Sequence, residues 1–200
     1  MKKSVLWRGS FYLLGMLILA FGITLNSRTG LGVSPIISLA YWFYALTGIP
    51  FSDATLLLYC LLAVVQAVIH LITRERKRAA SDLLQLVVSV IFTRFMSVYT
   101  LLLPDFTTLE GVWGSLPVRL LLLIPAIGCT GIGAAMTLDM RLIPNPGDGI
   151  IQTLADLTGK RTGTVKNIFD LSMVCLTLLC GLLSLHCFTA SLRWFRQSFI

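Results

Sequence analysis

Charged residues are scarce in this sequence. Asp, Glu, Lys and Arg account for 12% of its 200 residues, whereas soluble domains contain about 25%. Because 56% of the residues are hydrophobic and the mean hydropathy is +0.85, an ordinary soluble globular domain is excluded. Apolar runs recur along the whole chain and predict a polytopic helical membrane protein, all-α in class and surrounded by the lipid bilayer.

Residues that build metal centres and catalytic sites are also few. The sequence contains 2 histidines and 5 cysteines, and the cysteines follow no Cys-x-x-Cys spacing. His70 has no carboxylate or cysteine within four residues in the sequence, and His186 has Cys187 beside it but no carboxylate nearby. The sequence shows neither a catalytic triad nor a set of metal ligands, so we expect no metal, no cofactor and no enzymatic activity.

The 16 basic residues outnumber the 9 acidic ones, which gives a net charge of +7. Most of the basic residues lie between apolar runs, where they mark cytoplasmic loops and argue against nucleic-acid binding. We predict a cytoplasmic N-terminus, because Lys2, Lys3 and Arg8 precede the first run. The same rule places one basic cluster on the inner side: Arg74, Arg76, Lys77 and Arg78.

Two segments rich in glycine and proline break the apolar runs. The first, 30–35, precedes a short helix predicted over 36–46, and the second, 144–149, precedes one over 150–157. Neither short helix can cross a ~30 Å hydrocarbon core. We expect Asp53 and Asp82 to cap the long helices that begin at 54 and 83. Five long runs are predicted to span the membrane: 10–25, 54–72, 83–103, 117–138 and 165–185.

The order of long and short helices occurs twice, at an offset of 111 residues, as between Pro35 and Pro146. This offset also aligns two further pairs: Arg8 with Arg119, and Gly22 with Gly133. The match predicts an internal duplication, and the single span between the halves makes it an inverted repeat. We predict one transmembrane domain over 1–200, with five spanning helices and two short broken or re-entrant helices. Its parts are repeat 1 over 8–73, a connecting helix over 83–103, repeat 2 over 117–185 and an amphipathic tail over 187–200.

Small residues recur at helical spacing in the run 117–138. Ala126, Thr130 and Ala134 are each four residues apart, and glycines lie among them. This stripe predicts a face on which another helix packs closely.

The two breaks form the predicted binding site, since non-helical backbone at membrane depth has to face protein or water. Transporter folds bind substrates at broken helices in matching places of inverted halves. Ser34 and Asn145 lie at these breaks, and Asp148 lies in the second. In the alternative interpretation, both breaks are surface turns that hold short interfacial helices.

Arg94 lies halfway along the run 83–103, where a lone arginine costs about 2.5 to 3.5 kcal/mol. It therefore requires a partner, and we expect Asp148 or Asp170 to provide it. Such a pair would hold the helices together, whereas an unpaired Arg94 beside a cavity would attract anions. Arg28 is a further site candidate, although its place at a helix end also suits a solvated side chain.

Several of these segments resemble the YczE/YyaS/YitT-type family of bacterial integral membrane proteins. The matching segments are Arg28 to Pro35, Leu46-Thr47-Gly48, Ser81 to Leu86, and Asn145 to Ile150 with Asp170 downstream. The similarity covers about residues 8–185. It implies a multi-pass protein of the bacterial cytoplasmic membrane, in a family whose members are suggested as transporters or as accessory factors for cytoplasmic enzymes.

The chain differs from this family in ways that bear on a site. Ile37 and Ser97 stand where relatives commonly carry acids. Relatives also continue into a further apolar helix where this chain has its tail. Of the acidic residues that relatives carry in the repeated motif, this chain therefore keeps only Asp148.

Two functions follow from these features. The first is a small transporter-like protein whose small polar or anionic solute is bound by Arg94, Asn145, Asp148, Asp170, Arg28 and Ser34. The alternative is a non-transporting scaffold or accessory protein that binds a cytoplasmic protein through the basic cluster. The sequence leaves open both the identity of the solute and the formation of a homo-oligomer.

Overall fold

The computed structural model describes the backbone of residues 2–140 and 142–198. Side chains are described for these residues apart from 2–6, 76–77, 79–80 and 185–198. The side chains of Lys2, Lys3, Arg76 and Lys77, on which the predicted orientation and basic cluster partly rest, lie outside this description. The side chains of His186 and of the predicted amphipathic tail over 187–200 lie outside this description as well.

The described chain is helical and contains no strand. Within it there are seven α-helices: α1 (Lys2–Thr29), α2 (Pro35–Thr47), α3 (Phe51–Ile72), α4 (Arg76–Leu102), α5 (Leu116–Asp139), α6 (Pro146–Thr158) and α7 (Thr162–Ser198). A short 3-10 helix, η1 (Gly111–Gly114), precedes α5. Five helices, α1, α3, α4, α5 and α7, contain apolar stretches long enough to span a membrane. The prediction of an all-α polytopic protein with five long and two short helices is confirmed.

All seven helices begin earlier than the sequence predicts, and α6 begins at Pro146, inside the predicted break 144–149. Two predicted caps are affected. The Pro50 carbonyl accepts the first bonds of α3, so Asp53 lies inside the first turn and does not cap the helix. α4 begins at Arg76, and Asp82 lies well inside it. The Arg, Lys and Ala residues before Asp82 are strong helix formers, which extends α4 past the predicted cap. The predicted caps at Asp53 and Asp82 are therefore wrong.

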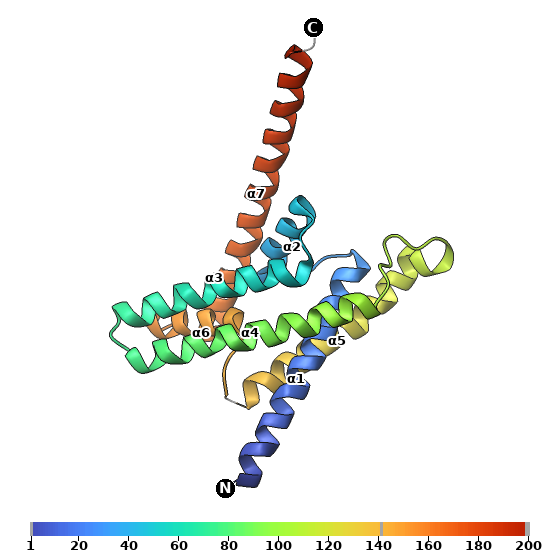
Figure 1. The fold of residues 1–200 in the computed structure, drawn as a ribbon. Helices are drawn as coiled ribbons and strands as arrows, with labels where there is room; N and C mark the ends of the chain where they lie inside the picture. The colour runs from blue at the N-terminus through green and yellow to red at the C-terminus, as the bar shows by residue number, and fades with distance from the viewer. Residues whose placement is uncertain (1, 141, 199–200) are drawn as a thin grey trace.

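α1 and α5 pack along each other (Figure 1). A Cβ atom on Gly22 would lie 2.5 Å from the Thr130 nitrogen, and one on Gly133 would lie 2.4 Å from the Leu19 nitrogen. Only glycine allows two helix backbones to approach this closely. The stripe of small residues predicted on α5 is thus a helix-packing face.

The two short helices have the same length and the same kinds of ends. α2 and α6 each have 13 residues, begin at a proline and stop at a left-handed glycine, Gly48 at φ 73° and Gly159 at φ 64°. A positive φ suits glycine and ends a helix by turning the chain away. The bounds 35–47 and 146–158 differ by 111 residues at both ends, as the sequence register predicts. Both short helices pack against α3 and α7.

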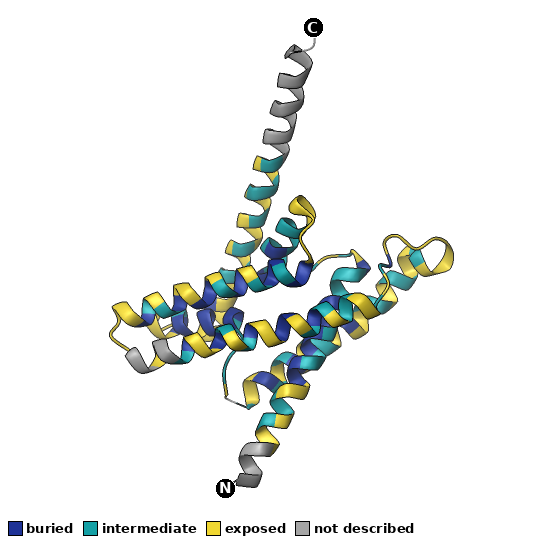
Figure 2. Ribbon diagram, in the orientation of Figure 1, coloured by how far each residue is buried: buried dark blue, intermediate teal, exposed yellow. Residues whose placement is uncertain are grey.

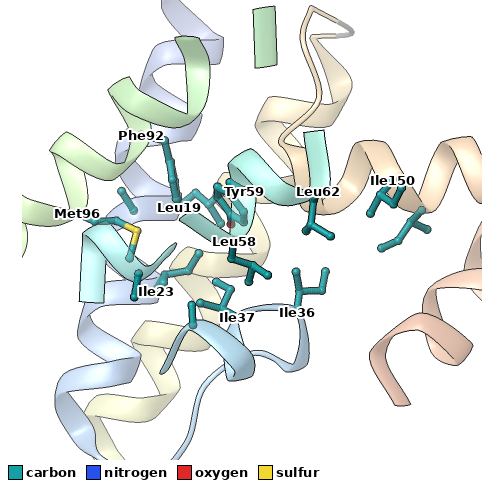
Figure 3. Close-up of a cluster of buried hydrophobic side chains, with 14 of the residues drawn as sticks. Leu19, Ile23, Ile36, Ile37, Leu58, Tyr59, Leu62, Phe92, Met96 and Ile150 are labelled. Atoms are coloured by element: carbon teal, nitrogen blue, oxygen red, sulfur yellow. The ribbon is translucent and has the colours of Figure 1, made fainter. Parts of the chain in front are cut away.

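The main hydrophobic core lies where α1, α2, α3, α4 and α6 meet (Figure 3). Side chains from each of these helices are at most 4% exposed: Leu19, Ile37, Tyr59, Phe92 and Ile150. α4 packs on both α3 and α1. It therefore joins the α1–α5 pair to α3 and the two short helices that pack on α3. The core therefore fixes the short helices relative to the long ones.

α7 extends away from the other helices and shows few buried residues (Figures 1 and 2). Val165, near its start, belongs to the core, whereas Leu178, Leu182 and Leu183 are each at least 61% exposed. Leucines exposed along a helix of this length suit contact with lipid or with another membrane helix.

Candidate functional site

A cavity of about 130 Å³ lies where the two helix breaks meet, and we call it the central cavity. Its polar lining comes from both breaks and from α3, α5 and α7: Ser34, Tyr59, Thr130, Asn145, Asp148 and Lys166. The structure therefore brings together three of the predicted site residues, Ser34, Asn145 and Asp148. Apolar residues of α1 and α2 complete the wall.

The two breaks have the same local geometry. Ser34 and Asn145 precede α2 and α6 with φ and ψ of −57° and 142° and of −61° and 141°, respectively. Neither side chain caps its own helix with a hydrogen bond. The proline that follows each of them starts the helix, since its fixed φ is helical. As a result, the N-termini of two helices lie at the central cavity, where they contribute partial positive charge.

Hydrogen bonds to long helices hold the second break in place. The Asn145 amide donates to the Tyr59 hydroxyl at 3.2 Å, and Tyr59 is only 2% exposed. The Tyr12 hydroxyl donates to the Ile143 carbonyl at 2.6 Å. These bonds satisfy polar groups where the chain is not helical, and they fix the orientation of Asn145 toward the cavity.

Charges of both signs lie near the central cavity. Lys166 Nζ is 3.4 Å from Asp170 Oδ2, one helical turn away on α7. Asp148 lies close enough to interact with the charges of both Lys166 and Asp170. The second oxygen of Asp170, Oδ1, is buried and accepts no hydrogen bond from the described residues. Asp148 thus lies within electrostatic range of the predicted residue Asp170, and the sequence reasoning missed Lys166, which lines the cavity with Asp148 and pairs with Asp170.

Arg94 is not part of this group. Its Nη2 atom lies 3.6 Å from Asp53 Oδ1, and its side chain is 61% exposed. The predicted pairing with Asp148 or Asp170 is therefore wrong. α4 packs mainly against α3 and α1, which puts the first turn of α3 within reach of Arg94.

Arg28 also lies away from the central cavity. Its guanidinium donates to the Thr100 carbonyl at 2.6 Å and pairs with Asp105 at 3.4 Å. Partial burial acts to raise the pKa of Asp105, but hydrogen bonds from Thr107 and the charge of Arg28 hold that pKa below its usual value. Arg28 therefore fastens the loop after α4 to the end of α1.

A second polar group lies between α3, α4 and α6, and we call it the Asp82 cluster: Gln66, His70, Asp82, Gln85 and Thr153. The Asp82 carboxylate lies 2.6 Å from His70 Nδ1 and accepts a 2.7 Å hydrogen bond from the Gln66 amide. Gln85 Nε2 lies 3.4 Å from the same carboxylate, and the Thr153 hydroxyl lies 3.4 Å from His70 Nε2. All five residues are at most 5% exposed and border a cavity of about 220 Å³. His70 thus has a buried acidic partner, Asp82, which is 12 residues away in the sequence.

A sequence model of a family of unknown function (DUF6198) matches residues 6–193. The chain belongs to this family. It is also similar to the uncharacterized membrane protein YczE of Bacillus subtilis (strain 168), with 22% identity over 175 residues that cover 87% of this chain and 75% of that protein. No solved structure matches the chain. The YczE-type resemblance predicted from the motifs is confirmed.

In this DUF6198 protein, helical spacing could have revealed the Asp82 cluster. Gln66 and His70 are four residues apart, and Asp82, Gln85 and Ser89 follow at intervals of three and four. Polar residues at this spacing within apolar runs mark one buried face of each helix. Because His70 and Asp82 are separated by the turn between α3 and α4, only the hairpin brings these two faces together.

Proposed function

We propose that this protein is a small transporter-like membrane protein that binds a small polar or anionic solute in the central cavity. The meeting of both helix breaks at one cavity, with polar side chains in its wall, carries the proposal. Two helix N-termini and the Lys166 ammonium group favour a solute with negative or hydrogen-bond-accepting groups. The carboxylates of Asp148 and Asp170 balance this positive charge, which suits a solute that also donates hydrogen bonds.

Reciprocal helix contacts support an inverted repeat. Gly22 packs on Thr130, while its counterpart Gly133 packs on Leu19, the counterpart of Thr130 at the same offset. Contacts that repeat with their partners exchanged are the mark of a two-fold relationship. Inverted halves with a site between them can expose that site to either side of the membrane in turn.

We further propose that the protein lies in the bacterial cytoplasmic membrane with its N-terminus in the cytoplasm. The basic residues before α1 and at the turn between α3 and α4 would then both be cytoplasmic. Arg74 in that turn is exposed, in keeping with contact with water or lipid headgroups.

Solute uptake by reconstituted liposomes tests the proposed function. Labelled glycine, acetate and orthophosphate serve as probes, with protein-free liposomes as the background. We expect uptake of at least one probe, reduced at least tenfold by Asp148→Asn and by Asn145→Ala. Asp53→Asn is the matched control, because its carboxyl pairs with Arg94 away from the cavity. Equal uptake by wild type and both cavity variants would refute the site.

The scaffold function remains the second candidate, through the basic turn that begins at Arg74. Arg78 pairs with both Glu75 and Asp156, at 3.0 and 2.6 Å, so Arg74 is the described arginine of this turn more available to a partner. Charge reversal by Arg74→Glu would abolish capture of a cytoplasmic protein if this function holds, whereas Asp148→Asn would leave capture intact. Loss of solute uptake in Asp148→Asn with unchanged capture in Arg74→Glu would favour the transporter.

A further inference from the structure

We propose that the cavity beside the Asp82 cluster is a second binding site, specific for a small monovalent cation such as sodium, potassium or ammonium. It is formed by different residues from the central cavity and does not depend on solute transport. Three observations carry this inference: a surplus of buried hydrogen-bond acceptors, an excess of negative charge, and a glycine that brings α6 against the cluster.

The acceptor surplus follows from the bonds of Asp82. His70 Nδ1 and the amide nitrogens of Gln66 and Gln85 all face its carboxylate. Each glutamine therefore turns its carbonyl oxygen away from Asp82, and turning either amide over would set oxygen against oxygen. Both carbonyl oxygens are buried and accept no hydrogen bond from the described residues. Buried acceptors without donors are unfavourable, and a cation bound among them would relieve this.

The charges around the cavity also favour a cation. Apart from His70, the charged residues that line it are Arg78, Asp82 and Asp156, which together carry one more negative than positive charge. Arg78 is engaged by Asp156 at 2.6 Å and by Glu75 at 3.0 Å, so its charge is already shared between two exposed carboxylates. Among the described residues, the carboxylate of Asp82, 3% exposed, faces His70 Nδ1 and two amide nitrogens within hydrogen-bond distance, and no lysine or arginine pairs with it.

The ligand types indicate a monovalent ion. One buried carboxylate with two amide oxygens and a hydroxyl offers oxygen atoms but little charge. Calcium sites typically combine several carboxylates, and zinc sites combine histidine, cysteine and acidic ligands. Within the described residues there is no group of three or more His, Cys, Asp or Glu that could hold a metal ion.

Gly149 brings α6 against the cluster. A Cβ atom at this position would lie 2.7 Å from Gln66 Oε1 and 3.0 Å from Gln85 Nε2. The absence of a side chain thus leaves room for the two amides. Gly149→Ala should displace them and weaken cation binding without removing any polar group.

Thermal unfolding of the full-length protein in detergent tests the proposal. Sodium, potassium or ammonium chloride is titrated into a choline chloride buffer at constant ionic strength, and unfolding is followed by fluorescence of the 4 tryptophans. We expect a saturable rise in Tm with at least one of the three cations and none with choline. Asp82→Asn should weaken the apparent affinity at least tenfold, and Gln66→Met and Gln85→Met about threefold or more.

Two control variants accompany the cluster variants, and three outcomes would overturn the proposal. Asp53→Asn and Asp148→Asn should respond to cations like the wild type, so a failed solute site does not affect this result. If Asp82→Asn does not fold, the two methionine variants decide, since they keep side-chain length and remove the carbonyl. The same Tm in every salt, or a full response in the cluster variants, would overturn the proposal. A response to pH alone that is lost in Gln66→Met and Gln85→Met would mean that only a proton binds, which also overturns it.

Discussion

Arg119 Nε donates a 2.6 Å hydrogen bond to the backbone carbonyl of Thr29, the last residue of α1. The contact has a counterpart, because Arg8 donates to the carbonyl of Met140, directly after the end of α5. The two donors are 111 residues apart, and so are the two acceptors. The helix that donates in one contact accepts in the other. An arginine near the start of each helix thus satisfies a carbonyl that the end of the other leaves without a helical partner.

Removing these arginines should destabilise the α1–α5 pair. Arg119→Gln loses a charged, part-buried hydrogen bond, and we expect the free energy of unfolding to fall by about 1.5 to 3 kcal/mol. Arg8→Gln should cost less, because that bond is exposed. Unfolding by SDS titration measures both. Arg161→Gln is the control and should change stability by less than about 1 kcal/mol, because Arg161 is exposed in the turn before α7. An Arg119→Gln protein as stable as the wild type would contradict the role of this bond.

The glycines at the α1–α5 crossing provide a second prediction. Gly22→Ala and Gly133→Ala force a methyl group against the backbone of the facing helix, which should cost about 1 to 3 kcal/mol each. Gly128→Ala and Gly131→Ala are matched controls on α5, because a Cβ atom there meets nothing within 4 Å. The controls should be neutral or stabilising by up to about 1 kcal/mol. The same SDS titration applies, and equal effects in both sets would rule out close packing as the cause.

A third prediction concerns the orientation of the halves. Ile49 and Lys160 follow α2 and α6 at equivalent, exposed positions. Single cysteines at these positions, in a background without the 5 native cysteines, should react with an impermeant maleimide from opposite sides of the membrane. Intact cells and inverted vesicles distinguish the two sides. Labelling of both positions from one side would refute the inverted repeat.

The loop after α4 should show a pH dependence. The pKa of Asp105 is lowered in the folded protein, so its contribution to stability is complete above its usual pKa of about 4. That contribution is lost as the pH falls through the lowered value. Asp105→Asn should therefore reduce the free energy of unfolding by about 1 kcal/mol at neutral pH. The difference from the wild type should shrink below about pH 4. Glu110→Gln, an exposed change in the same loop, is the control.

Local signals made most of the fold predictable. Apolar runs, prolines and glycines mark where helices begin and end, and the short helices gave the offset of 111 residues that their bounds keep. The predicted starts of helices were less accurate where the residues before the apolar run are themselves good helix formers. Asp82 looked like a cap because it precedes an apolar run, yet the basic and alanine residues before it continue the helix.

The lining of the central cavity was predictable only where its residues lie in the two predicted breaks. Ser34, Asn145 and Asp148 are there, and the structure gathers them at one cavity. Tyr59 and Lys166 lie on long helices, so no local pattern separates them from other helix residues. The partner of Arg94 was missed for a similar reason, because which acid lies within reach depends on which helices pack together.

Asp148 and Gly149 are adjacent in the first turn of α6, yet Asp148 lines the central cavity and Gly149 lines the cavity of the Asp82 cluster. A single turn is therefore the common wall of two compartments. A ligand that shifts this wall from one side changes affinity on the other, and thermodynamic linkage requires both affinities to change by the same factor. The two cavities would then act as one cooperative unit, with cation concentration setting the occupancy of the solute site.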